Sequence, residues 1–228
     1  MDDQRRDYEK EASAQASLKF IKDGQVVGLG TGSTAAYFIK ALAEQVKNGL
    51  RIRGIPTSVR SRELALSLGI PLTTLDECQE IAVTVDGADE VDRQLRLIKG
   101  GGGAMLREKI VASATRQLII VADSTKLVPA LGKFPVPAEV IPFAQALVAK
   151  RITALGADVR LRTRTDGKPF VTDEHNHILD CHFGGIEDPE GLARQLSDMP
   201  GVVEHGLFIG MASVALFAKG SEIIELRR

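Results

Sequence analysis

The sequence predicts an α/β protein in which a mainly parallel sheet carries a smaller, inserted α+β domain. In the first half of the chain, short apolar strands alternate with helical segments, as in βα units. The pattern changes near Leu131, where Pro135, Pro137 and Pro142 fall close together. The last segment, 207–226, is again strand-like, and we expect it to return to the first domain.

The first half contains the elements expected of a Rossmann-like sheet. Its helices show apolar residues at helical spacing, and its strands are short apolar runs. The predicted helices are 5–22, 34–46, 59–68 and 104–115, and the predicted strands are 25–29, 51–55, 81–85, 95–98 and 118–122.

The second half has the element order β-α-β-β-α-β, which is the signature of a ferredoxin-like domain. Its predicted strands are 134–141, 158–163, 177–183 and 201–206, and its predicted helices are 143–155 and 189–197. We therefore predict a Rossmann-like domain of residues 1–131 and 207–228, with a small α+β domain of residues 132–206 inserted into it.

Composition excludes several classes of protein. The 228 residues are 44% hydrophobic and 26% charged, which is enough apolar material for a packed core. The net charge of −1 and the 4% of aromatic residues, with no Trp, argue against nucleic acid or an anionic membrane as the main partner. Neither a leader segment nor an apolar run of membrane-spanning length is evident, so we expect a cytoplasmic protein.

Cysteine and histidine give no case for a disulfide framework or a metal site. Cys78 and Cys181 lie far apart in the sequence, which fits thiols in a reducing compartment. His175, His177 and His182 are clustered, but a strand over 177–182 would direct His177 and His182 to opposite faces. We expect no metal.

Polar and charged residues follow the predicted strands. In open α/β sheets, ligands bind beyond the carboxyl ends of the strands, so these segments are the candidate site. They are Gly30–Thr34, Pro56–Ser58, Asp86–Glu90, Lys99–Gly103 and Asp123–Lys126.

The segment Gly30-Thr-Gly-Ser-Thr34 ends where a helix begins. Its backbone N–H groups, its hydroxyls and the helix dipole suit a phosphate, although a plain strand–helix turn is an equal reading. A dinucleotide fingerprint fails because Ser33 stands where a third glycine belongs and the second strand ends in Thr57 and Ser58 rather than an acid. The segment lacks the Gly-Lys-Ser/Thr of a Walker A loop.

The segment Asp86-Gly-Ala-Asp89 places two carboxylates on a tight turn, with Glu90 and Asp92 close behind. It reads either as a solvated Asp-Gly turn or as carboxylates that bind sugar hydroxyls and move their protons. A divalent cation is a third reading, for which further ligands are not evident.

Lys99 followed by four glycines is the most unusual feature. The run is short for a linker and leads directly into a helix. Such a loop can direct several N–H groups at one developing negative charge, with Lys99 adding a full positive charge. Glu108 lies one turn into that helix, either as a surface residue beside Arg107 and Lys109 or within reach of a ligand at the loop.

Together these motifs resemble ribose-5-phosphate isomerase, type A. The resemblance is carried by GLGTGSTA at 28–35, DGADE at 86–90, KGGGGAMLREKI at 99–110, ADSTK at 122–126 and GKFPVPAEVIPFA at 132–144. PGVVEHGLF at 200–208 resembles the family's late segment, so the likeness covers nearly the whole chain in order.

The resemblance implies the interconversion of ribose 5-phosphate and ribulose 5-phosphate in the pentose phosphate pathway, with no cofactor, by a homodimer or a homotetramer. It implies that Glu108 is the catalytic base. The implied substrate-binding residues are Lys10, Thr31, Gly32, Ser33, Thr34, Asp86, Gly87, Ala88, Asp89, Lys99, Gly100, Gly101, Gly102 and Lys126.

Combined with the chemistry of the residues, this predicts one carboxylate, Glu108, moving a proton between two carbons through a cis-enediolate. Lys99 and the N–H groups of Gly100 to Gly102 would stabilise the enediolate, and Asp86 would assist ring opening. Two alternatives remain at this point: a non-catalytic sugar-phosphate sensor, and a related-fold amino-sugar-phosphate deaminase or CoA transferase.

Overall fold

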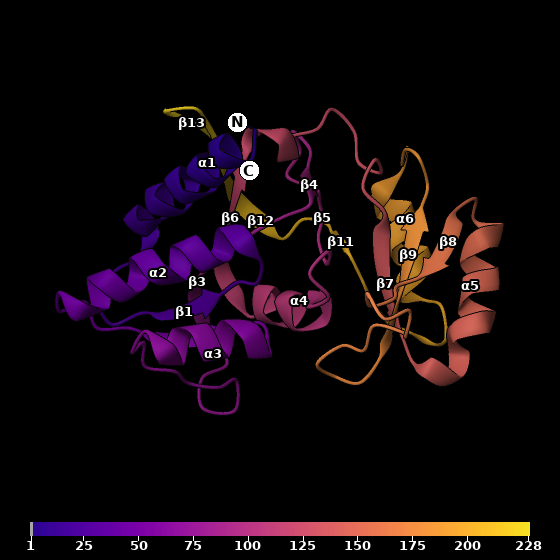
Figure 1. Ribbon diagram of the computed structural model, residues 1–228, viewed down its shortest axis with the longest axis horizontal. Helices are drawn as coiled ribbons and strands as arrows, with labels where there is room; N and C mark the ends of the chain where they lie inside the picture. Colours follow the sequence, from indigo (N-terminus) through magenta and orange to yellow (C-terminus); the bar gives the residue numbers. More distant parts are fainter. Residues whose placement is uncertain (1) are drawn as a thin grey trace. The chain divides into compact units, whose positions relative to one another are not determined.

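The computed structural model describes residues 2–228, and these form two compact units (Figure 1). The first unit comprises the residues up to Ala88, Arg107–Leu127 and Met211–Arg228, and the second comprises Asp89–Leu106 and Val128–Gly210. The predicted domain limits instead assign residues 89–106, 128–131 and 207–210 to the larger domain, and they stay a prediction.

The first unit is built on a six-stranded sheet with the strand order β13-β12-β6-β3-β1-β2. Every neighbouring pair is parallel except β12 and β13, which are antiparallel, so the predicted mainly parallel α/β fold is confirmed. The strands are β1 (Val26–Leu29), β2 (Arg53–Pro56), β3 (Ile81–Asp86), β6 (Thr115–Asp123), β12 (Ala212–Lys219) and β13 (Glu222–Arg227).

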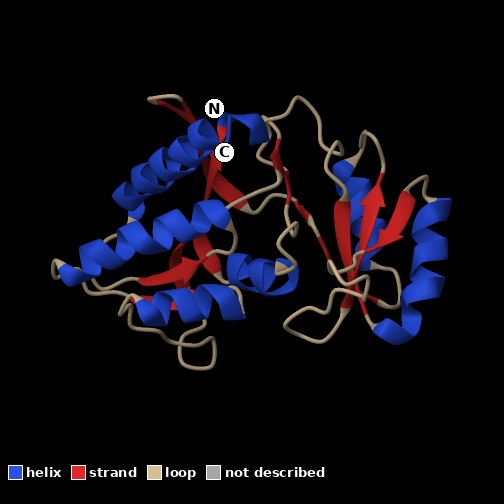
Figure 2. Ribbon diagram, viewed as in Figure 1, coloured by secondary structure: helices blue, strands red, loops and turns tan. Residues whose placement is uncertain are grey.

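Helices of the first unit pack on this sheet and bury its apolar strands, which explains why the strands read as continuous hydrophobic runs (Figure 2). Phe38 and Leu42 of α2 are fully buried in the same core cluster as Val85 and Val121 of the sheet. The helical elements are α1 (Asp2–Ser17), η1 (Leu18–Phe20), α2 (Ser33–Lys47), α3 (Val59–Ser67), α4 (Met105–Ser113) and η2 (Ser124–Lys126). The boundary between the two units falls inside α4.

The second unit contains a four-stranded antiparallel sheet with the order β10-β7-β9-β8, the arrangement expected from the β-α-β-β-α-β order. Val148 of α5 and Leu196 of α6 are fully buried in its core. The elements are β7 (Val136–Val140), η3 (Pro142–Ala144), α5 (Gln145–Ala154), β8 (Asp158–Leu161), β9 (His177–His182), α6 (Pro189–Ser197) and β10 (Val202–His205).

A small three-stranded sheet in the second unit was not expected. It pairs β4 (Glu90–Val91), β5 (Leu97–Ile98) and β11 (Leu207–Phe208) in the order β11-β5-β4. The predicted strand 95–98 is therefore only two residues long and lies outside the parallel sheet.

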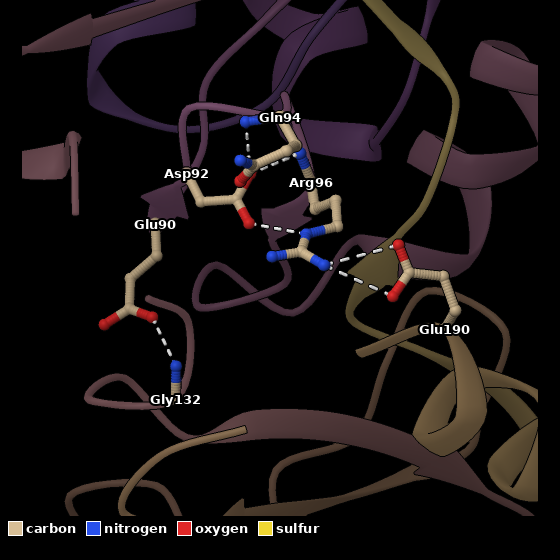
Figure 3. Close-up of polar contacts among 6 residues, drawn as sticks. All are labelled: Glu90, Asp92, Gln94, Arg96, Gly132 and Glu190. Atoms are coloured by element: carbon tan, nitrogen blue, oxygen red, sulfur yellow. Dashed lines mark hydrogen bonds and ion pairs between the residues drawn. The ribbon is translucent and has the colours of Figure 1, made fainter. Parts of the chain in front are cut away.

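Asp92 shapes the turn between β4 and β5 (Figure 3). Its Oδ1 accepts the N–H groups of Gln94 at 2.9 Å and Arg96 at 3.0 Å, and its Oδ2 accepts the Arg96 guanidinium. Arg96 also pairs with Glu190 at 3.3 Å. These contacts hold the backbone of Leu95 at φ 58, a conformation that residues other than glycine rarely adopt. The predicted strand 95–98 is therefore shortened at its start.

A buried carboxylate fastens α1 to the first unit's sheet. Glu9 is 2% exposed, and its Oε2 accepts the N–H and hydroxyl of Ser124 at 3.2 and 3.0 Å. Its Oε1 accepts Arg5 Nε and the Gly220 N–H, both at 3.0 Å. Burial by itself raises the pKa of this carboxyl, but the hydrogen bonds from Gly220, Arg5 and Ser124 outweigh it and lower that pKa from 4.5 to about 2.

We predict that Glu9→Gln lowers the free energy of unfolding at pH 7 by about 1.5–3 kcal/mol, because its amide NH₂ would face groups that are themselves donors. The native carboxylate stabilises the fold fully above pH 4.5, and this contribution is lost as the pH falls from 4.5 towards 2. Urea unfolding of both proteins at pH 7 and near pH 3 should therefore show a difference that shrinks in acid.

Glu44→Gln is the matched control, since Glu44 lies on α2 with its side chain 64% exposed and pairs with the exposed Lys47. We expect it to change stability by less than about 0.5 kcal/mol. A wild-type advantage over Glu9→Gln that is the same at both pH values would contradict the assigned role of the carboxylate.

Candidate active site

The segment Gly30–Thr34, which leads from β1 into the first turn of α2, is fixed by the carboxylate of Asp86 at the end of β3. Asp86 is 1% exposed, and its Oδ1 accepts the N–H groups of Thr31 at 3.0 Å and Gly87 at 2.7 Å. A Cβ on Gly30 would lie 2.3 Å from that Oδ1 and 2.6 Å from the Asp86 Cα. The two strand ends can approach this closely only because residue 30 is glycine.

The hydroxyl of Thr31 is held from the end of the neighbouring strand β2. Its Oγ1 lies 2.7 Å from Thr57 Oγ1 and 2.8 Å from Ser58 Oγ. Ser58 is also the N-cap of α3 and forms a capping box with Ser61. The start of α3 thereby positions the Ser58 hydroxyl that contacts Thr31. The sequence analysis placed Thr57 and Ser58 in a candidate segment and noted that they are not acidic, but it missed their contact with Thr31.

The start of α2 keeps the features that favour an anion. Its N-cap is Gly32, at φ 109, and no side chain caps the helix there. Ser33 and Thr34 follow as the first residues of the fifteen-residue helix. The N–H groups and the helix dipole at this end therefore suit a negatively charged group.

Glu108 lies in the first turn of α4 and is only 4% exposed. The reading as an exposed surface acid is therefore wrong. A carboxylate removed from bulk water in this way can serve as a proton acceptor whose basicity depends on its surroundings.

Two lysines of the predicted site are also in the first unit. Lys10 is on α1, where its Nζ lies 3.0 Å from Asp7 Oδ1 and its side chain is 20% exposed. Lys126 ends η2, whose preceding residue Asp123 accepts the N–H of Thr125 at 3.0 Å.

A pocket of about 220 Å³, lined by Arg5, Arg6, Glu9, Ser124 and Thr125, opens beside this short helix and was not predicted.

The glycine loop Gly100–Gly103 belongs to the second unit. Gly100 and Gly103 have φ 100 and φ 82, and the Gly103 N–H donates to Gly100 O at 3.0 Å, which closes a tight turn. The Gly101 N–H donates to Asp89 Oδ2 at 2.8 Å. A Cβ on Gly101 would lie 2.6 Å from Asp89 Oδ1, so the carboxylate rests directly on the loop.

Lys99, which precedes this loop, is buried, with 2% of its surface exposed. Its N–H donates to Gly206 O at 2.9 Å, and its Nζ lies 5.4 Å from the centre of the Phe208 ring. A Cβ on Gly206 would lie 2.3 Å from Lys99 O. Gly206 was missed by the sequence analysis, because only its contact with a residue 107 positions away shows that it must be glycine.

The two acids that follow Asp89 have structural roles. Glu90 accepts the N–H of Gly132 at 2.7 Å through Oε2 (Figure 3) and the N–H of Phe134 at 2.7 Å through Oε1. Asp92 holds the β4–β5 turn. Both carboxylates accept hydrogen bonds from the chain itself, which weakens the reading of this acidic stretch as a cation site.

Each unit contains some of the predicted site residues. Hydrogen bonds bring Thr31, Asp86 and Gly87 together in one unit, and Asp89 and Gly101 together in the other. The first unit contains Lys10, Thr31, Gly32, Ser33, Thr34, Asp86, Gly87, Ala88, Glu108 and Lys126, and the second contains Asp89, Lys99, Gly100, Gly101 and Gly102.

Within residues 2–228, no group of three or more His, Cys, Asp or Glu side chains is arranged to hold a metal ion. Over the same residues, none of the helices has the length and apolar character needed to cross a bilayer.

Comparison with known proteins identifies close relatives. The family model for ribose 5-phosphate isomerase A (phosphoriboisomerase A) matches residues 53–222. Ribose-5-phosphate isomerase A of Parvibaculum lavamentivorans is 54% identical over 96% of this chain and 98% of its own length.

Solved structures of ribose 5-phosphate isomerases also match this chain. A D-ribose-5-phosphate isomerase in complex with phospho-erythronic acid is 41% identical, with a TM-score of 0.95 over 98% of this chain and 99% of its own. Ribose 5-phosphate isomerase A of Methanocaldococcus jannaschii is 39% identical, with a TM-score of 0.92 over 96% of this chain and 98% of its own.

We predict that Gly30→Ala lowers the free energy of unfolding by about 1–3 kcal/mol, because its methyl group would displace Asp86. Gly87→Ala is the matched control from the adjoining loop, where a Cβ would meet nothing closer than 3.9 Å. We expect that variant to stay within about 1 kcal/mol of wild type. Equal stabilities of the two variants in urea unfolding would refute the close-packing argument.

Proposed function

The chain belongs to the ribose 5-phosphate isomerase A family, and on that premise we propose that it interconverts D-ribose 5-phosphate and D-ribulose 5-phosphate with Glu108 as its base. The family consists of aldose–ketose isomerases, and this part of the proposal rests on the comparisons. The observation that supports the finer assignment is the buried carboxylate of Glu108 in the first turn of the helix that follows the glycine loop.

The proposed reaction moves one proton between neighbouring carbons and needs no oxidant or reductant. The Glu108 carboxylate takes the proton from C2 of the open-chain aldose, and the C–H electron pair forms the C1=C2 bond of a cis-enediolate. The hydroxyl proton passes from O2 to O1, and protonated Glu108 returns its proton to C1 as the C2 carbonyl forms. Base and acid are thus one group acting twice.

Negative charge develops on the enediolate oxygens, and we assign its stabilisation to Lys99 and the glycine loop. Fixed N–H donors and a cation in a dry environment stabilise such charge much better than water does. Because the Gly101 N–H already donates to Asp89, we assign the donor role first to Gly100 and Gly102. Gly101 then has the task of holding Asp89.

Binding and ring opening fall to the remaining predicted residues. Asp86 is the proposed acid–base group for opening the furanose ring, and Asp89 positions the substrate hydroxyls. Lys10, Lys126 and the loop Thr31–Thr34 hold the phosphate end, where the uncapped start of α2 favours an anion. A solved relative in complex with phospho-erythronic acid supports a phosphorylated, hydroxyl-rich ligand.

The same proposal includes a place in the non-oxidative pentose phosphate pathway, catalysis without a cofactor, and a cytoplasmic location. It also includes assembly as a homodimer or homotetramer. Light scattering coupled to size-exclusion chromatography measures the mass in solution and tests the assembly directly.

We predict that Glu108→Gln lowers kcat by about 10²–10⁴-fold, because the amide keeps the shape of the side chain but cannot accept the proton. Glu63→Gln, on the exposed face of α3, is the control and should keep wild-type turnover. The measurement is ribulose 5-phosphate formation from ribose 5-phosphate, with the melting temperature recorded for each variant.

The same assay in deuterated water tests the path of the proton. Wild-type enzyme should place deuterium on C1 of the ketose, because the proton held by the carboxyl can exchange with solvent. Near-wild-type turnover by a folded Glu108→Gln variant would disprove the assignment of the base. A wild-type protein that forms no ribulose 5-phosphate would disprove the proposed activity.

We predict that Lys126→Met raises KM for ribose 5-phosphate by at least about tenfold, with a smaller effect on kcat. A charge that contacts the phosphate contributes to substrate and transition state alike. Lys19→Met is a suitable control, since Lys19 is 52% exposed and pairs with Glu225 on β13. A KM unchanged from wild type would remove Lys126 from the phosphate site.

A further inference from the structure

Arg162 fastens the glycine loop to the four-stranded sheet of the second unit. It follows β8, and its side chain is only 14% exposed. Its Nη1 donates to Gly100 O at 2.9 Å and to Gly101 O at 3.2 Å. Its Nε donates to Asp180 Oδ2 on β9 at 3.0 Å, and its Nη2 donates to the other oxygen of that carboxylate. One rigid guanidinium thus joins a sheet carboxylate to two consecutive peptide carbonyls.

The contact fixes the direction of two peptide planes. In a trans peptide, the N–H points opposite to the C=O of the same plane. Because Arg162 holds the carbonyls of Gly100 and Gly101, the N–H groups of Gly101 and Gly102 are directed away from it. The bond from the Gly101 N–H to Asp89 agrees with this direction. A cation on the carbonyl side also polarises each plane and strengthens its N–H as a donor.

A second contact supports the loop through Phe170. A Cβ on Gly103 would lie 2.5 Å from Phe170 Cζ, so the ring packs directly on the loop backbone. The Phe170 N–H donates to Arg162 O at 2.9 Å, and the ring centre lies 5.9 Å from the Arg162 Cζ. Arg162 therefore contacts the loop directly and also holds Phe170, the second residue that packs on it.

The segment that carries Phe170 is itself anchored in the sheet. Glu139 on β7 is 1% exposed, and its Oε1 accepts Thr172 Oγ1 at 2.8 Å and Asn176 Nδ2 at 3.0 Å. Burial raises the pKa of this carboxyl. Thr172 lies two residues after Phe170, so its hydrogen bond to Glu139 helps to position the Phe170 ring against the loop.

We propose that Arg162 is a positioning residue for the isomerase reaction, orienting the N–H groups of Gly101 and Gly102 in the glycine loop through its two carbonyl contacts and the Asp180 anchor. This inference rests on the function proposed above. It gives strands β8 and β9 of the four-stranded sheet a part in catalysis that needs no contact with substrate.

The test compares Arg162→Met and Arg162→Lys with wild type in the ribose 5-phosphate assay. We expect Arg162→Met to lower kcat by about 10²-fold, the effect of a misplaced catalytic geometry, with KM within about threefold of wild type. Lysine keeps the charge but lacks the planar fork, so Arg162→Lys should fall between the two.

Arg160→Met is the matched control. Arg160 lies on β8, two residues away, and pairs with Asp158, with both side chains at least 60% exposed. We expect it to keep kcat within about twofold of wild type. A wild-type kcat in Arg162→Met, a loss confined to KM, or an equal loss in Arg160→Met would overturn the proposal. If Arg162→Met fails to fold, Arg162→Lys decides, and a wild-type kcat in that variant overturns the proposal.

A measurement independent of turnover separates this proposal from the proposed function. In protein labelled with ¹⁵N-glycine, Arg162→Lys should shift the amide resonances of Gly101 and Gly102 and speed their hydrogen exchange, while Arg160→Met leaves both unchanged. Unchanged loop resonances overturn the positioning role even in an active enzyme. If wild-type protein fails to convert ribose 5-phosphate, the proposed function fails, and shifted resonances then support only the orientation of the loop by Arg162.

Discussion

The carboxylate of Asp86 occupies the space beside Gly30 and accepts two backbone N–H groups there, one from each of two neighbouring loops. Burying a carboxylate costs several kcal/mol unless hydrogen bonds replace its water. The loops supply those bonds only in the conformation observed, so the carboxylate and the loops define each other's positions. The Thr31 hydroxyl extends the same network to the end of β2. Three adjacent strand ends are thereby fixed around one buried charge.

The two glycine clusters that stand out in the sequence satisfy different physical demands. Gly28 and Gly30 are needed for space, because Thr84 and Asp86 of β3 lie where their side chains would be. Gly100 is needed for backbone conformation, since its φ of 100 is one that L residues rarely adopt. Gly101 combines close approach with a hydrogen bond to Asp89. In each cluster one glycine, Gly30 or Gly101, allows a carboxylate to lie against the backbone.

The sequence was sufficient for the order of the main elements, which depends on local patterns, whereas the candidate site that it indicates stays a prediction. Apolar runs and helical spacing are encoded within a few residues, and so are the Gly-rich and Asp-rich motifs. The β4–β5 pair was missed because strands of two residues carry no period, and the turn depends on Asp92 and the φ of Leu95. The supports of the site were missed for a related reason. Arg162 contacts the glycine loop, and Gly206 contacts Lys99 just before it, across roughly 60 to 110 residues of chain, and patterns in a single sequence do not reveal contacts over such separations.

Glu9 ties the beginning of the chain to Gly220, across 211 residues, and β12 fills the place between β6 and β13. Ribosomes add roughly 5–20 residues per second, so about 10–40 s separate the synthesis of the two partners of that hydrogen bond. Throughout this interval α1 lacks its anchor at Gly220, and β6 has an unpaired edge that can pair with other chains. Most of the second unit, residues 128–210, leaves the ribosome before that edge is covered. The parallel sheet is therefore the part of the nascent chain that is begun first and completed last.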